Sequence, residues 1–183
     1  MYHRCPGCKT IFTPDNIDHL VVTENDAITH RNNSLRFEEV LMRTGSGDAE
    51  QGPFIDFGCG NGAFVDYMNR TGLDAMGIDK DTSCQLVDLN KDLYGGAFMI
   101  ESIEHLSNPI ETVLEIGTKL RPFGFLYIES TFAESIADHT DHPYVSPKIG
   151  HRTILSRQAL IAATAEVFDA KVLNSNVVIL RKK

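Results

Sequence analysis

The fold is decided by the stretch Phe54-Ile55-Asp56-Phe57-Gly58-Cys59-Gly60-Asn61-Gly62, an apolar run that leads directly into a glycine-rich turn. Glycines at this density let the backbone come against a ligand, because no Cβ stands in the way. The residues that follow, 62–70, predict a helix whose first N–H groups face the same ligand. Gly58, Gly60 and Ala63 also satisfy the G-x-G-x-x-G/A dinucleotide fingerprint, so the glycines alone do not identify the ligand. A tight turn without a ligand is the alternative.

One helix after the glycine-rich turn, the apolar run 73–79 ends in an acidic residue, Asp79. Asp79 lies 19 positions after Gly60. A carboxylate at this place can accept hydrogen bonds from both hydroxyls of a ribose, as it does in dinucleotide sites. The sequence therefore predicts a nucleotide-like ligand at the ends of the first two core strands. A solvated carboxylate at a strand end is the alternative.

Strands and helices alternate along the rest of the chain, which predicts a parallel sheet covered by helices. Further strands are expected at 85–89 (a short one), 97–101 and 125–129, and a turn at 121–124. Further helices are expected near 35–42, from Pro109 and behind Ser156, and the segments 171–173 and 176–180 predict a hairpin. The expected fold is α/β and Rossmann-like, with a mostly parallel sheet, helices on both faces and a C-terminal antiparallel hairpin.

The composition sets bounds on partners and location. A chain of 183 residues fits one domain. Its net charge of −8 gives no broad attraction to nucleic acid or to an anionic membrane, so neither is expected as a partner. No apolar run approaches membrane-spanning length, and the polar start is not that of a signal peptide. The four cysteines indicate thiols or a metal site and not disulfides. We expect a cytoplasmic protein, and the sequence does not indicate its oligomeric state.

Four segments between Phe54 and Glu129, one of which ends at Asp79, together resemble the class I S-adenosylmethionine (SAM) methyltransferases, and a further likeness lies nearer the C-terminus. Asp56 and the third glycine, Gly62, resemble the first motif of that family, and residues 98–109, with Glu104-His105 before a proline-started helix, resemble its fourth-strand motif. Residues 120–129 resemble its leucine-lysine-proline-glycine-glycine turn and fifth strand, with arginine in place of the lysine and phenylalanine in place of the first glycine. Residues 150–156 are similar to the histidine and capping serine before the last helix of many sugar and metabolite methyltransferases.

The resemblance implies that SAM is the cofactor and that a small molecule or a sugar accepts the methyl group. It places the methionine part of SAM at the glycine-rich turn, the ribose on Asp79 and the adenine amino group near Asp88, which is otherwise a surface charge. The cofactor-binding residues that it implies are Asp56, Gly58, Gly60, Asn61, Gly62, Asp79, Asp88 and Glu101. A dehydrogenase is disfavoured, because the chain has no recognisable substrate half and its glycine turn follows some fifty residues of other sequence.

The chain departs from this family between Asp79 and Ala97, where few residues stand in place of a helix, a strand and another helix. We expect the second helix to be lost and the third strand to be rudimentary, so the fold is shortened between its second and fourth strands. The wall around the adenine would then be thin. A non-catalytic SAM-binding or scaffold protein is therefore a second class of function to consider.

Two histidines are candidates for the chemistry. The methyl group of SAM is already electrophilic, so a base is needed only where the acceptor must lose a proton. Ligands of open α/β sheets lie beyond the carboxyl ends of the strands, and both His105 and His151 are expected there. Either is a candidate for the catalytic base or for orienting the acceptor. Alternatively, His105 caps its own helix and His151 is an ordinary loop histidine.

A metal-dependent alternative uses the same residues. Glu101, Glu104, His105 and His151 resemble the metal-ligand set of small-RNA 3′-terminal ribose 2′-O-methyltransferases. Two carboxylates and two imidazoles could hold a divalent cation that lowers the pKa of a ribose hydroxyl. This hypothesis requires the four side chains to converge on one point. The acidic net charge stands against it, and we assign no metal to the site from the sequence.

The N-terminal segment contains the pair Cys5-Pro6-Gly7-Cys8, which has the knuckle spacing of a zinc site. A closed structural site needs four ligands, and the sequence contains no second pair of this kind. The segment resembles half of the cysteine-paired ribbon with which related methyltransferases begin. We therefore leave open zinc or a metal-free turn. We expect residues 1–20 to form this segment and residues 21–183 to form the methyltransferase-like domain.

Overall fold

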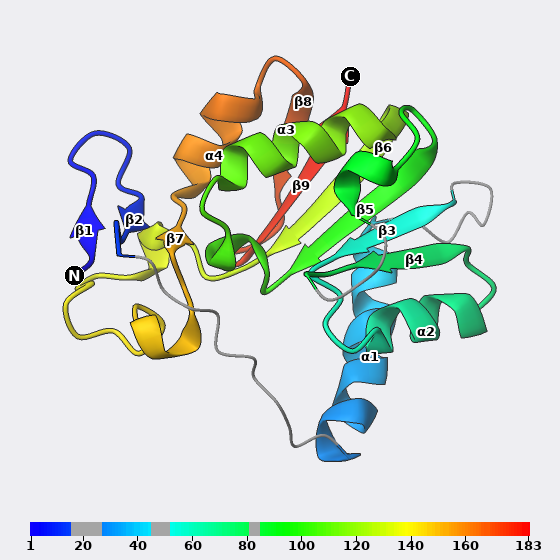
Figure 1. The fold of residues 1–183 in the computed structure, drawn as a ribbon, viewed down its shortest axis with the longest axis horizontal. Helices are drawn as coiled ribbons and strands as arrows, with labels where there is room; N and C mark the ends of the chain where they lie inside the picture. Colours follow the sequence, from blue (N-terminus) through cyan, green and yellow to red (C-terminus); the bar gives the residue numbers. More distant parts are fainter. Residues whose placement is uncertain (16–26, 45–51, 81–84) are drawn as a thin grey trace.

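The structure is a computed structural model that describes residues 1–15, 27–44, 52–80 and 85–183. Its centre is a six-stranded sheet with the strand order β4-β3-β5-β6-β9-β8 (Figure 1). The parallel strands are β3 (Phe54–Phe57), β4 (Ala75–Ile78), β5 (Tyr94–Ile100) and β6 (Leu120–Glu129). The antiparallel hairpin of β8 (Phe168–Val172) and β9 (Val177–Lys182) is added to β6. The expected mostly parallel sheet and C-terminal hairpin are thus confirmed.

Helices cover both faces of this sheet, as expected. Strand residues alternate between two apolar clusters, because successive side chains point to opposite faces. On one face Ile55 and Met99 pack with α3 (Pro109–Lys119) and α4 (Arg157–Thr164). On the other face Phe54 and Phe98 pack with α1 (Ala27–Thr44) and α2 (Ala63–Arg70). This two-sided core holds the carboxyl ends of the parallel strands together at one edge.

The region between β4 and β5 differs from the expectation. The short strand predicted at 85–89 is wrong, because the structure has the 3-10 helix η2 (Leu86–Asp88) there. The Asp88 carboxylate accepts a hydrogen bond from the backbone N–H of Gln85 at 2.9 Å, which favours a capped turn over a strand. In the described sheet β4 therefore pairs only with β3 and forms an edge.

The turn predicted at 121–124 lies inside β6 as an irregularity. Tyr94 pairs with Leu120 and Gly96 pairs with Phe125, so the intervening residues of β6 bulge out of the ladder. Phe123 occupies the position at which the class I methyltransferase turn motif has its first glycine. It adopts a left-handed φ of 63° and is 77% exposed. The chain thus departs from the regular ladder at the predicted turn, and β6 continues on both sides of the bulge.

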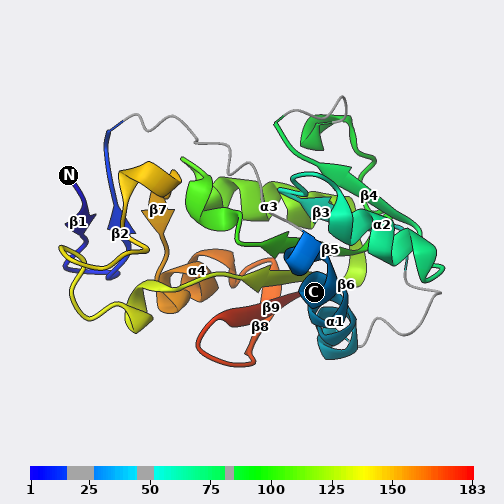
Figure 2. The same cartoon turned by 90° about the horizontal axis from the view of Figure 1, so that it is seen from below.

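A second, three-stranded sheet lies at one end of the molecule (Figures 1 and 2). It consists of β1 (His3–Arg4), β2 (Ile11–Phe12) and β7 (Thr153–Ile154), all antiparallel. β2 thus pairs with the chain just after His151, and β1 pairs with the other side of β2. The boundary expected at residue 20 lies outside the described residues. Within the described ranges, no helix is long and apolar enough to cross a membrane.

Candidate functional site

The glycine loop, residues 58–62, follows β3 at the carboxyl edge of the sheet. Gly58, Gly60 and Gly62 have φ values of 80°, 53° and 80°, a left-handed conformation that favours glycine. A Cβ on Gly58 would lie 2.4 Å from the Cβ of Ser102, whereas a Cβ on Gly60 or Gly62 would meet nothing within 4 Å. The loop is therefore packed against the protein on one side and open on the other, as a backbone cradle for a ligand requires.

Asp79 joins the end of β4 to this loop. Its carboxylate accepts hydrogen bonds from the backbone N–H groups of Gly60 at 2.9 Å and Lys80 at 2.7 Å. Asn61 contributes in a different way, since its side-chain oxygen accepts from the N–H of Ala63 at 3.2 Å, at the start of α2. The structure thus brings Asp79 and the glycine loop together, as the sequence predicts. The role of Asp79 toward a ribose stays a prediction.

Asp56 is a buried carboxyl group beneath the loop, with 4% of its surface exposed. Burial and, to a smaller extent, the neighbouring Asp79 carboxylate together raise the pKa of Asp56 to about 7. Asp88 lies on η2, and the side chain of Gln85 links this turn to the backbone oxygen of Asp79 at 3.3 Å. The carboxylate of Asp88 thus caps η2, and its proximity to an adenine also stays a prediction.

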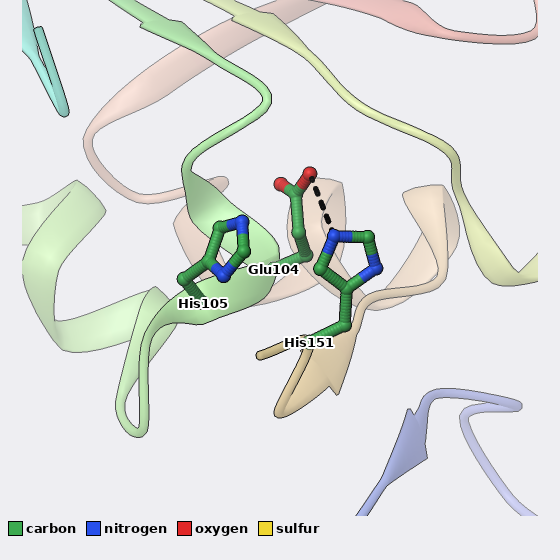
Figure 3. A group of neighbouring side chains, drawn as sticks. All are labelled: Glu104, His105 and His151. Atoms are coloured by element: carbon green, nitrogen blue, oxygen red, sulfur yellow. Dashed lines mark ion pairs between the residues drawn. The ribbon is translucent and has the colours of Figure 1, made fainter. Parts of the chain in front are cut away.

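A second group of polar side chains follows β5 at the same edge (Figure 3). We call Glu104, His105 and His151 the histidine cluster. Glu104 and His105 lie in the 3-10 helix η3 (Ile103–His105), and His151 precedes β7. The Glu104 side chain is 1% exposed, accepts hydrogen bonds from the hydroxyls of Ser130 (3.1 Å) and Tyr144, and lies 3.8 Å from Nε2 of His151. A buried carboxylate is thus satisfied by groups from distant segments.

Both histidines are oriented by backbone carbonyls. Nδ1 of His105 lies 3.1 Å from the oxygen of Gly150, and Nδ1 of His151 lies 2.8 Å from the oxygen of Tyr144. A carbonyl only accepts, so each Nδ1 carries a proton, and in the neutral ring of His105 the lone pair is on Nε2. Burial and then the neighbouring His151 lower the pKa of His105, which keeps it neutral near pH 7. His105 therefore has the protonation state of a general base.

Glu101 lies with the histidine cluster at the end of β5. Its backbone has a left-handed φ of 49°, and its N–H donates to the oxygen of Glu129 at 2.9 Å. One carboxyl oxygen of Glu101 lies 3.0 Å from the Tyr144 hydroxyl. Burial and then the nearby Glu104 carboxylate raise the pKa of Glu101. The residues predicted as cofactor-binding thus form two groups, with Glu101 beside the histidines and the others at or near the glycine loop.

The histidine cluster has the geometry to hold a cation. One potential ligand atom each from Glu104, His105 and His151 lies within 4.8 Å of the other two. The two imidazole rings lie 4.7 Å apart between centroids. Glu101 is not a member of this group, so three of the four residues of the metal hypothesis converge. Among the described residues, Cys5 and Cys8 belong to no such group, and the structure gives the zinc interpretation of this pair no support.

The sequence did not indicate Ser130 or Tyr144. Tyr144 contacts the carboxyl groups of Glu101 and Glu104 through its hydroxyl, and its ring centroid lies 4.1 Å from that of His151. Both residues lie in the polar segment between β6 and β7, which has no periodicity that would place its side chains. A single sequence therefore offered no signal for them.

Residues 29–167 of the chain match a protein family described as a methyltransferase domain. A SAM-dependent methyltransferase from Archaeoglobus fulgidus has a similar structure, with 15% identity, a TM-score of 0.59 and coverage of 84% of this chain and 94% of its own. A SAM-bound amino pentose methyltransferase from Micromonospora echinaspora has 12% identity, a TM-score of 0.57 and coverage of 90% and 100%. At these identities the likeness shows the fold. No curated protein sequence matches the chain.

A third similar structure comes from a complex between the Haloferax volcanii Trm112 methyltransferase activator and a methyltransferase. It has 14% identity, a TM-score of 0.56 and coverage of 87% of this chain and 99% of its own. The three structures together give the six-stranded sheet and its helices the fold of the class I methyltransferases.

Proposed function

The chain belongs to the methyltransferase-domain family, and we propose that it transfers the methyl group of SAM to a hydroxyl or amino group of a small molecule or sugar, with His105 as the base. The observation that carries this proposal is the arrangement at one sheet edge: an open glycine loop lies beside a neutral histidine whose Nε2 has the lone pair. Ser102 links the two parts, since its Cβ fills the position against Gly58 and its hydroxyl donates to the Phe57 oxygen at 3.0 Å.

The glycine loop suits the methionine part of SAM, because its open side leaves room at Gly60 and Gly62. In the proposal Asp79 accepts hydrogen bonds from the ribose hydroxyls while it still accepts the N–H of Gly60. Asp56 supports the loop from below, Asn61 accepts from the N–H of Ala63 at the start of α2, and Asp88 lies near the adenine. The hydrogen-bonding capacity of each of these groups fits its proposed role. Substitution of the residue tests that role.

SAM supplies an electrophilic methyl group when it is bound. The chain itself has to align the acceptor atom and remove its proton, and alignment alone can lower the barrier by about 7–11 kcal/mol. Nε2 of His105 accepts the proton from the acceptor, and Nδ1 keeps its proton on the Gly150 carbonyl. His151 and Glu104 are buried behind His105, so we assign them an orienting role. This arrangement needs no charged base at neutral pH.

A small molecule or sugar is supported as the acceptor by two features. The segments 98–109 and 150–156, which resemble those of small-molecule and sugar methyltransferases, are the ones that carry His105 and His151. The net charge of −8 disfavours a polyanionic acceptor. In this proposal the protein acts in the cytoplasm on a freely diffusing substrate.

The convergence of Glu104, His105 and His151 favours one second candidate, a metal-dependent RNA 3′-terminal ribose 2′-O-methyltransferase. In that case the two Nε2 atoms and the Glu104 carboxylate would hold a divalent cation, and the cation would lower the pKa of the ribose hydroxyl. Isothermal titration of Mn²⁺ into wild type and His151→Gln separates the candidates. Binding that the substitution abolishes, with methylation of an RNA oligonucleotide that EDTA abolishes, selects this second function.

The primary test is a thermal-shift and calorimetric screen of SAM, S-adenosylhomocysteine (SAH) and NAD. A ligand of the native state raises the melting temperature, and we expect this from SAM and SAH and not from NAD. Incubation with SAM and a panel of sugars and small metabolites, followed by mass spectrometry, then identifies the acceptor by its added methyl group. Cofactor binding without any methylated product would favour the non-catalytic SAM-binding alternative.

A further inference from the structure

Tyr144 contacts the histidine cluster in three ways. Its hydroxyl donates to Glu104 and lies 3.0 Å from Glu101 and 3.2 Å from the Ser130 hydroxyl. Its backbone oxygen accepts from Nδ1 of His151 at 2.8 Å. Its ring lies 4.1 Å from the His151 ring between centroids, at an interplanar angle of 56°. One residue therefore determines the surroundings of both Glu104 and His151.

The hydroxyl of Tyr144 has one proton to donate. Burial and the two neighbouring carboxylates raise its pKa, so the hydroxyl keeps that proton across the accessible pH range. The Glu104 carboxylate is 1% exposed and has two hydroxyl donors, Tyr144 and Ser130. Loss of one donor leaves a buried carboxylate oxygen short of a hydrogen bond, which is costly enough to make the side chain turn toward another donor. Nε2 of His151 lies 3.8 Å from the Glu104 oxygen that Tyr144 contacts, so a turn of this carboxylate changes the surroundings of the His151 ring.

Tyr144 is itself held by the N-terminal strands. It packs with Tyr2 and Val145 against the apolar cluster that contains Ile11 of β2 and Ile154 of β7. The Tyr2 hydroxyl donates to the backbone oxygen of His151. The three-stranded sheet therefore supports the tyrosine and the histidine together, away from the glycine loop.

We propose that Tyr144 is a positioning residue for methyl transfer: through Glu104 and His151 it holds the histidine cluster in the geometry in which His105 accepts the proton of the acceptor. This inference rests on the proposed function, because it gives Tyr144 a part in that reaction. It assigns to Tyr144 no contact with SAM. Its effect must therefore appear in the acceptor step and in the His151 ring, and not in cofactor affinity.

The test uses Tyr144→Phe, which keeps the ring and the backbone carbonyl and removes the hydroxyl. Tyr94→Phe is the control, since Tyr94 is a buried tyrosine at the start of β5 whose hydroxyl lies 3.4 Å from the Met76 sulfur and not in the histidine cluster. We expect Tyr144→Phe to lower kcat by about 10- to 100-fold, as a misplaced catalytic group does. The dissociation constant of SAH should stay within about twofold of wild type, because no contact of Tyr144 involves the glycine loop. The control should leave both unchanged.

A second readout does not need the acceptor. The ¹H–¹³C ring signal of His151, assigned with His151→Gln, should move in Tyr144→Phe and not in Tyr94→Phe. In a Glu104→Gln background, Tyr144→Phe should shift the His151 signal little further. The effects of two substitutions are not additive when one residue acts through the other. A His151 signal that Tyr144→Phe leaves in place, or a loss of SAH affinity equal to the loss of kcat, overturns the inference. If wild type methylates no acceptor, the proposed function fails, whereas the His151 signal still decides whether Tyr144 positions the cluster.

Discussion

The glycine loop and the histidine cluster lie at the same edge of the sheet but are assembled differently. The loop is one continuous stretch between β3 and α2, and its shape comes from three left-handed glycines and from Asp79 one strand away. The cluster joins η3 to the segment before β7, and hydroxyls from the loop after β6 complete it. Cofactor binding should therefore depend on local backbone geometry, whereas proton transfer should depend on hydrogen bonds between distant segments.

The largest effect is expected from His105→Gln. Removal of the proposed base should lower kcat by about 10²- to 10⁴-fold, the usual contribution of general-base catalysis. SAH affinity should not change, because His105 belongs to the cluster and not to the loop. Steady-state kinetics and isothermal titration measure the two quantities. The exposed His3 on β1 supplies the control His3→Gln, and a similar loss of SAH affinity in His105→Gln would break the division between the two regions.

On the loop side, Gly58→Ala should destabilise the fold strongly. The new Cβ would lie 2.4 Å from Cβ of Ser102, and the residue would keep a φ of 80°, so we expect a loss of about 3 kcal/mol or more in the free energy of unfolding. Gly60→Ala is the matched control, because it has a left-handed φ of 53° without any neighbour within 4 Å. It should lose about 1–2 kcal/mol. Denaturant unfolding of both variants checks this, and equal losses would refute the packing argument at Gly58.

Asp56, beneath the glycine loop, should make the stability of the folded protein depend on pH. Its pKa is raised in the folded state to about 7, so the folded protein holds a proton that the unfolded chain releases near pH 4. Stability contributed by this proton is complete below about pH 4 and is lost as the pH rises to about 7. Asp56→Asn should therefore flatten the fall in melting temperature across this range. If wild type and Asp56→Asn fall in parallel, Asp56 does not carry that proton.

The smallest effect concerns the bulge in β6, which lies away from both regions. Phe123 has a left-handed φ of 63° and a largely exposed side chain. Phe123→Gly removes the strain of that conformation, about 1–2 kcal/mol, and adds the chain entropy of glycine, about 0.5–1 kcal/mol. We expect a net stabilisation of between zero and about 1.5 kcal/mol in denaturant unfolding, with no change in SAH affinity. A destabilised variant would mean that the Phe123 ring has a structural role.

The sequence predicted the loop region well because its determinants are local. A strand, three glycines, a helix and a second acidic strand end occupy residues 54–79 in a fixed order, and the structure places Asp79 on the N–H of Gly60. The prediction at 85–89 was wrong because apolar residues there suggested a strand, whereas Asp88 caps a 3-10 turn through the N–H of Gln85. A local side-chain hydrogen bond outweighed the apolar pattern.

The histidine cluster was only partly predictable. Glu104 and His105 stand out in a motif, and His151 lies in a second one, but no pattern showed that their side chains would come within 4.8 Å of one another. Their contact depends on Tyr144 and Ser130, which lie in a polar segment, and on β2, which pairs with β1 and with β7 next to His151. Such non-local hydrogen bonds leave no periodicity in a single sequence.

The division between the two regions is tested most directly by isothermal titration of SAH into Asp79→Ala and His105→Gln, side by side with wild type. Loss of the proposed charge-assisted hydrogen bonds to the ribose should weaken SAH binding to Asp79→Ala by about 1–3 kcal/mol. His105→Gln should bind SAH as wild type does. Wild-type affinity in Asp79→Ala, or an equal loss of affinity in both variants, would contradict the division between the glycine loop and the histidine cluster.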